Sequence, residues 1–103
     1  MMFKINGKEY KAKEIDFNSV IEMKDLGGDI YEMGRNPFAV IRAYLAYCGG
    51  MTADKAGEEI NAHVVSGGDL TVLSEALNDA LEKSDFFKAM VARAKKAESD
   101  AKA

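Results

Sequence analysis

Three pairs of adjacent glycines, at positions 27–28, 49–50 and 67–68, divide this chain of 103 residues into short segments. Glycine readily takes up the left-handed backbone conformation that often ends a helix, so a glycine pair after a helical pattern is a strong stop signal. Each pair here follows a stretch in which apolar residues recur at helical spacing. The sequence therefore predicts a series of short helices, each ending in a left-handed turn.

Five helices are expected from these stops and from the residues that begin each segment. Their ranges are about 17–26, 37–48, 53–66, 70–83 and 85–94, and the expected caps are Asp16 or Asn18, Asn36, Thr52, Asp69 and Ser84. The apolar positions of the first helix are Phe17, Val20, Ile21 and Met23, which are expected to face the core. The helix over 37–48 is apolar nearly all round, which is typical of a buried central helix.

A β-hairpin is expected over residues 2–13, before the helices. Asn6–Gly7 supplies the positive φ angles that a two-residue hairpin turn requires. A lone hairpin is marginal in water, so this one is expected to lie on the helices. The predicted fold is mainly α (α+β), with the hairpin followed by a compact bundle of four or five helices. Residues 1–94 form one globular domain in this prediction, and residues 95–103 form a flexible charged tail.

Charge and apolar pattern argue against membranes and nucleic acids as partners. The net charge is −3, which is the wrong sign for a protein that binds phosphate backbones. The best apolar stretch, residues 38–48, contains Arg42 and is far shorter than the ~20 residues that span a bilayer. No signal-peptide pattern begins the chain, and its single cysteine cannot form an internal disulfide. We therefore expect a cytoplasmic protein without nucleic-acid or membrane partners.

The charge is unevenly distributed along the chain. Residues 54–82 carry seven acidic side chains and one lysine, whereas residues 83–103 carry six basic and three acidic side chains. Each block is either the solvated face of its helices or part of a contact. In the second case the acidic block meets a basic partner, or it receives the basic C-terminal helix of a second copy through self-association.

The residues that catalysis or metal binding would need are scarce. The chain has one cysteine, Cys48, and one histidine, His63, and neither lies in a sequence typical of a catalytic site. Cys48 lies on the apolar helix, where a free cysteine usually behaves as a small buried apolar residue. His63 follows Glu59 by four residues, so a pair on one helix face accounts for it. We expect no enzymatic activity and no catalytic, cofactor-binding or metal-binding residues.

Two adjacent phenylalanines begin the last helix and make it the candidate partner-binding element. Phe86 and Phe87 point about 100° apart on a helix, so both are buried only if a broad face is covered. One interpretation is that they simply close the core. The other is that one ring closes the core while the second, with Met90 and Val91, contacts a partner helix. The partner-binding residues of this hypothesis are Phe86, Phe87, Met90 and Val91.

Several runs of the sequence resemble the small tail assembly chaperones of long-tailed phages and prophages. These runs are Ile5–Tyr10, "DFNSVIEMKDLG" at 16–27, "NPFAVIRAYLAYCGGM" at 36–51, "KAGEEINAHVVSGGDL" at 55–70 and "SDFFKAM" at 84–90. The resemblance covers most of the chain, from about Phe3 to Met90, and rests on the order of elements and the general pattern.

The resemblance implies a non-enzymatic assembly factor of the host cytoplasm that is absent from the finished virion. Such proteins bind the tape measure protein and keep it soluble, and they help recruit tail-tube subunits around it. Many of these families also make a longer form by a programmed frameshift. The alternative is a generic helical adaptor of prophage or bacterial origin, which would bind another folded protein.

Overall fold

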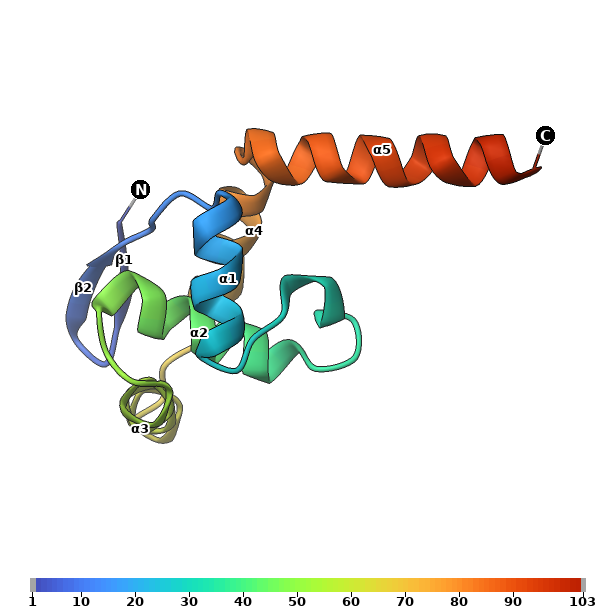
Figure 1. Ribbon diagram of the computed structural model, residues 1–103. Coiled ribbons are helices and arrows are strands. Elements are labelled where there is room, and N and C mark those ends of the chain that lie inside the picture. Colours follow the sequence, from blue (N-terminus) through green and yellow to red (C-terminus); the bar gives the residue numbers. More distant parts are fainter. Residues whose placement is uncertain (1, 103) are drawn as a thin grey trace.

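The computed structural model describes the backbone of residues 2–102 and the side chains of residues 2–93. Its elements, in chain order, are β1 (Met2–Ile5), β2 (Lys8–Lys11), α1 (Phe17–Asp25), the 3-10 helix η1 (Ile30–Glu32), α2 (Pro37–Gly49), α3 (Ala53–Val65), α4 (Thr71–Glu82) and α5 (Asp85–Lys102) (Figure 1). The predicted α+β fold, a hairpin followed by helices, is confirmed.

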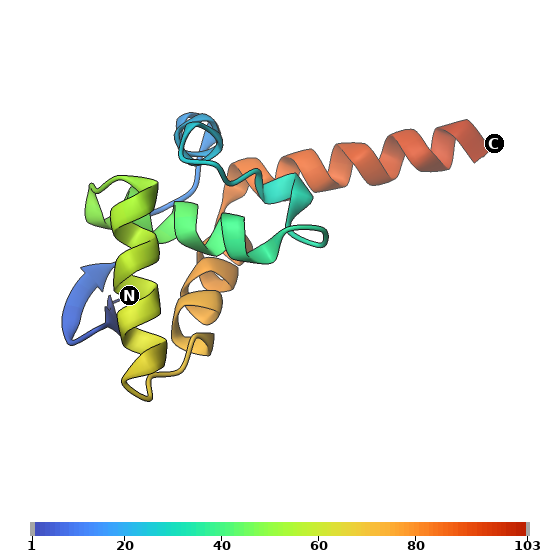
Figure 2. The same ribbon diagram turned by 90° about the horizontal axis from the view of Figure 1, so that it is seen from below.

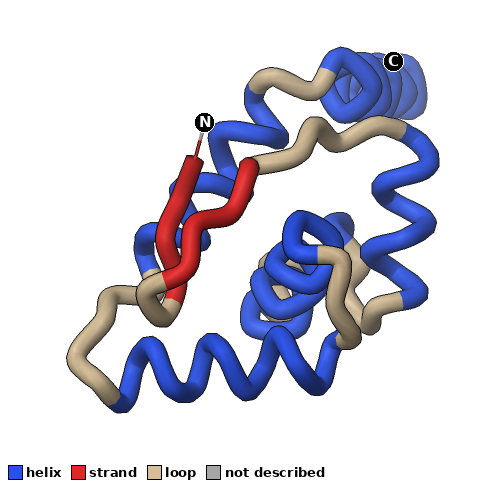
Figure 3. The backbone as a smooth tube through the Cα atoms, turned by 90° about the vertical axis from the view of Figure 1, so that its left-hand side faces the viewer, coloured by secondary structure: helices blue, strands red, loops and turns tan. Residues whose placement is uncertain are grey.

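The hairpin forms as the Asn6–Gly7 turn predicts. The two turn residues have φ angles of 52° and 77°, and the antiparallel register pairs Phe3 with Tyr10. Phe3 and Ile5 point to the same face of the hairpin and are both buried. The strands lie side by side at one edge of the helical part, where β1 contacts α3 and α4 (Figure 3).

Helix α2 crosses the middle of the molecule and contacts α1, η1, α3, α4 and β2 (Figure 2). Its buried residues are Val40, Ile41, Ala43, Tyr44, Leu45 and Ala46. Phe38, near its start, is an exception with 71% of its surface exposed. The Tyr44 hydroxyl donates to the carbonyl of Lys13 at 3.0 Å, and burial raises the pKa of this phenol. The apolar sequence of this segment thus predicted its central place correctly.

Three of the expected caps bind backbone N–H groups at the helix starts: Asp16 accepts from Ser19, Thr52 from Lys55 and Ser84 from Phe87. Asp69 accepts from the N–H of Thr71, but the cap residue of α4 is Leu70, so Asp69 lies one residue before the position predicted for it. Asn36 makes no such bond, although Pro37 follows it as the first residue of α2. The expected left-handed ends are also present, because Gly27, Gly50 and Gly67 have φ angles of 92°, 63° and 96°.

Helix α1 buries only part of the apolar face that its sequence predicts. Met23 is buried and Val20 packs against the core, as expected, whereas Phe17 and Ile21 are 61% and 46% exposed and Ser19 is buried. The physical reason lies in Ser19, whose hydroxyl is 2.7 Å from the hydroxyl of Tyr47 on α2. This contact between residues distant in sequence fixes the rotation of α1 and leaves two large apolar side chains outside.

Gly28 allows α1 and α2 to come close together. A Cβ atom at this position would lie 2.5 Å from the Cβ of Ala43 and 2.7 Å from the carbonyl oxygen of Ala39. Real Cβ atoms do not come this close to their neighbours, so the crossing requires a residue without a side chain.

Helix α5 continues to Lys102, beyond the predicted end at Ala94. Residues 95–102 have no glycine or proline and contain Ala, Lys and Glu, which all favour a helix. The helix projects from the rest of the molecule (Figure 1), whose extents are 53 × 24 × 23 Å. The side chains beyond Arg93 lie outside the described residues, and the flexibility expected for 95–103 stays a prediction.

Candidate partner-binding surface

The first turn of α5 is fixed to the globular part by Ser84, which is 5% exposed. Its hydroxyl oxygen accepts from the N–H of Phe87 at 3.0 Å and donates to the carbonyl of Ile15, in the segment before α1. One side chain therefore begins the helix and also sets its direction. The residues of the first two turns are held in place while the helix continues away from the core.

Phe87 and Val91 face a groove between α4 and α5. Phe87 is half-buried and packs against the hydrophobic core, and its ring centroid lies 6.2 Å from that of Tyr31. The groove has a volume of about 730 Å³ and is lined by Asn78, Leu81, Glu82, Phe87, Lys88, Val91 and Ala92. We call it the α4–α5 groove. Most of its lining residues are apolar, and Glu82 and Lys88 add one charge of each sign.

Phe86 lies on another side of α5 and contacts Phe17, one of the two exposed apolar residues of α1. The ring of Phe86 is half-buried and meets the ring of Phe17 edge to face, with centroids 5.7 Å apart and an interplanar angle of 78°. Met90, one turn further along, is 40% exposed. Ile21 follows Phe17 by one turn on α1 and is also exposed. We call these four residues the α1–α5 surface.

The four predicted partner-binding residues thus lie in the first two turns of α5 but on two sides of the helix, with Phe87 and Val91 at the α4–α5 groove and Phe86 against Phe17. Phe87 is the ring that packs against the core, and Phe86 is the outer one. Phe17 and Ile21 were missed because their helical spacing indicated a core face. No local signal marks them, because the burial of Ser19 that turns them outward depends on its contact with Tyr47 on α2.

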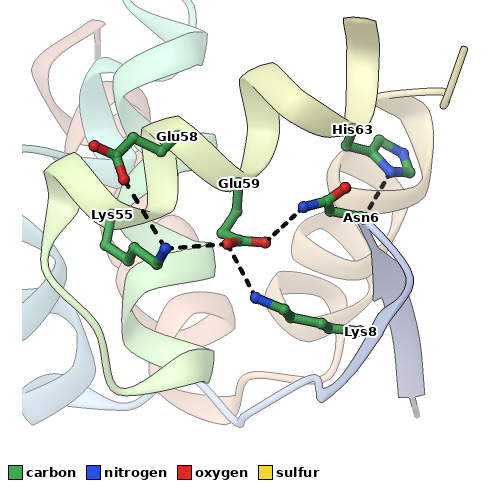
Figure 4. A network of polar contacts seen from close by, with 6 residues as sticks. All are labelled: Asn6, Lys8, Lys55, Glu58, Glu59 and His63. Atoms are coloured by element: carbon green, nitrogen blue, oxygen red, sulfur yellow. Dashed lines mark hydrogen bonds and ion pairs between the residues drawn. The ribbon is translucent and has the colours of Figure 1, made fainter. Parts of the chain in front are cut away.

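A separate polar cluster joins the hairpin turn to α3 (Figure 4). Glu59 is 5% exposed, and its two carboxylate oxygens accept from the Asn6 side-chain amide and the Lys8 ammonium, each at 3.0 Å. Lys55 also lies 3.4 Å from this carboxylate. The hydrogen bonds from Asn6 and Lys8 lower the pKa of Glu59 to about 2. The group is therefore a charged anchor at neutral pH.

His63 anchors the same turn instead of pairing with Glu59. Its Nδ1 accepts from the backbone N–H of Asn6 at 2.9 Å, which places the ring proton on Nε2. Nε2 then donates to the carbonyl of Asp69 at 3.1 Å.

Burial raises the pKa of the Cys48 thiol, which keeps it protonated. Both His63 nitrogens bind groups other than Cys48, so these contacts do not assemble the nucleophile pair that catalysis by Cys48 would require.

Searches of protein-family models, of curated proteins and of solved structures found no match to the chain. Within the described residues, no group of three or more His, Cys, Asp or Glu side chains is placed to hold a metal ion. No helix in the described part of the chain combines the length and apolar character needed to cross a membrane.

Proposed function

We propose that this protein is a non-enzymatic tail assembly chaperone of a phage or prophage. In this proposal it binds the tape measure protein in the host cytoplasm, helps recruit tail-tube subunits, and is absent from the finished virion. The observation that carries the proposal is the α1–α5 surface with the neighbouring α4–α5 groove. Together they leave large apolar side chains only partly covered on a helix that projects from the core.

The physical requirements of such a client fit this surface. A long helical protein with apolar stripes aggregates unless those stripes are covered, and a helix or groove with exposed apolar residues can cover them reversibly. Phe86 and Phe17 offer rigid aromatic area, whereas Met90 offers a side chain that adapts to different partners. The resemblance of residues 3–90 to tail assembly chaperones supports the same function.

The alternative is a generic helical adaptor that binds a folded partner. The order of the neighbouring genes distinguishes the two functions without an experiment on the protein. A tail assembly chaperone is expected to be encoded between the major tail protein and a very long tape measure gene, whereas an adaptor has no such constraint.

Co-expression with the neighbouring tape measure protein tests the proposal directly. The wild-type chain is expected to raise the soluble fraction of this client. Phe86→Ser should fold normally and lose that effect, because Phe86 lies on the outer side of α5. Phe87→Ser should lower the melting temperature, because its ring packs against the core.

Val65→Ser is the matched control, since this side chain is 78% exposed and lies on α3, away from the α1–α5 surface. It should protect the client as the wild type does. If the wild type leaves the client insoluble, the proposed function is wrong. If Phe86→Ser folds and still protects the client, the function survives but the assigned surface is wrong.

A further inference from the structure

Arg42 lies in a second apolar groove, which shares no lining residue with the α4–α5 groove. This α2–α3 groove has a volume of about 640 Å³, and its walls include Phe38 and Ile41 from α2 and Ile60 and Val64 from α3. Arg42 is the only charged residue in the sequence of α2. A charge in the middle of an otherwise apolar helix and groove calls for a physical reason.

Two glycines border the Arg42 side chain and show its course. A Cβ atom on Gly57 would lie 3.4 Å from Cδ of Arg42, and a Cβ atom on Gly27 would lie 3.4 Å from its Nη2. The alkyl part therefore passes along α3, and the guanidinium lies beside the C-terminal end of α1. The C-terminal end of a helix carries partial negative charge and stabilises a nearby cation, so the Arg42 guanidinium can lie there without a carboxylate partner.

The guanidinium has no acidic partner within the described residues. Its Nε atom is buried and makes no hydrogen bond there. Two carboxylates of α3, those of Glu58 and Glu59, instead form ion pairs with Lys55 and Lys8. Arginine presents its N–H groups in a planar fork that matches a carboxylate, and a buried N–H without a partner costs free energy.

We propose that the α2–α3 groove binds a helical segment of a partner protein that carries a carboxylate between apolar side chains. The walls of the groove are two helices and offer no strand edge, so a helix lying in the groove is the fitting binding mode. Phe38 and Val64, which are 71% and 47% exposed, would cover the apolar side chains of this segment. Arg42 would pair with its carboxylate in a charge-assisted contact away from water.

Charge also argues against the C-terminal helix of a second copy as the occupant. The described part of α5 beyond its first residue presents Lys88 and Arg93, which have the same sign as Arg42. The proposal concerns a surface distinct from that of the proposed chaperone function, and it does not depend on the identity of the client.

A display library of helical 16-residue peptides, with a fixed leucine stripe and randomised positions between the leucines, tests this proposal on the full chain. Enriched peptides are expected to carry Asp or Glu flanked by apolar residues. For the strongest peptide, changing that acid to its amide should weaken binding about tenfold, the scale of one charge-assisted contact. Arg42→Gln should remove the difference between the acid and amide forms.

Two further variants separate binding from folding. Arg93→Gln changes the net charge equally but lies on α5, so it should bind both peptides as the wild type does. Phe38→Ser alters an exposed wall of the groove and should weaken both peptides while leaving the melting temperature unchanged. It tests the groove even if Arg42→Gln unfolds.

Three outcomes would overturn the proposal. The first is a selection without enrichment of acidic residues, and the second is equal binding of the acid and amide peptides by the wild type. The third is self-association in sedimentation experiments that Arg42→Gln abolishes, because it would assign the groove to a second copy. A negative peptide result would overturn only the proposal for the α2–α3 groove, and a negative co-expression result would overturn only the proposed chaperone function.

Discussion

Glu59 joins α3 to the hairpin turn through contacts that span 53 residues to Asn6 and 51 residues to Lys8. Its carboxylate is nearly covered but remains charged, because an amide and two ammonium groups surround it. A covered carboxylate with this many partners stabilises the folded state only while it is ionised. Glu59, the side chain that holds the hairpin turn, is therefore expected to contribute to the acid sensitivity of the protein.

Acid unfolding tests this role of Glu59. The pKa of Glu59 is about 2 in the folded state against an ordinary value of 4.5, so the unfolded chain takes up the proton first as the pH falls. The stabilisation is expected to be complete above pH 4.5 and to decline as the pH falls toward 2. Urea unfolding at pH 7, 4.5 and 3 should show a smaller loss of unfolding free energy for Glu59→Gln than for the wild type.

Glu58→Gln provides the control for this experiment, since its side chain is 74% exposed and its one ion pair, to Lys55, is 3.9 Å long. Its pH dependence should match that of the wild type. A Glu59→Gln variant with the same loss between pH 4.5 and 3 as the wild type would contradict the anchor role.

At the scale of elements, the approach of α1 to α2 depends on Gly28. Gly28→Ala should lower the free energy of unfolding by about 1–3 kcal/mol, because the added Cβ forces the two helices apart. Gly34→Ala is the matched control, since a Cβ there meets nothing within 4 Å. Urea unfolding curves of both variants measure the difference. Equal curves for the two would show that the crossing can relax at little cost.

Most elements could be predicted because their signals are local. The Asn6–Gly7 turn, the glycine stops and the caps at Thr52 and Ser84 each act on residues within one or two turns. The rotation of α1 could not be predicted, because it depends on Ser19 meeting Tyr47, 28 residues away. The end of α5 was also predicted wrongly. The helix was expected to end at Ala94, where the apolar residues end, but no glycine or proline stops it before Lys102.

The candidate binding surfaces also combine residues that the sequence indicates and contacts that only the tertiary structure shows. Phe86, Phe87, Met90 and Val91 could be proposed from sequence, since adjacent phenylalanines on a short helix indicate excess apolar area. The partnership of Phe17 with Phe86 required the tertiary structure, because α1 and α5 are far apart in the chain. The α2–α3 groove likewise required the tertiary structure, because its lining residues come from α2, α3 and the segments beside them.

At the scale of the whole molecule, the direction of α5 determines the shape. A compact domain of this length has a radius of gyration of about 13 Å, whereas the Cα atoms here give 14.8 Å. Small-angle scattering of dilute protein should therefore give a value nearer 15 Å than ~13 Å. Truncation after Arg93 should bring the value down, and a wild-type value of ~13 Å would mean that α5 folds back on the core.

The contacts of the hairpin determine when the protein can finish folding during its synthesis. Asn6 is held by His63, which lies 57 residues later, and Ile15 is held by Ser84, which lies 69 residues later. An isolated hairpin is barely stable, so the two strands are not held in place until α3 and α4 have been synthesised. A nascent chain that has not yet reached α4 therefore exposes Phe3 and Ile5, which are buried in the folded protein, and such exposed apolar side chains favour aggregation.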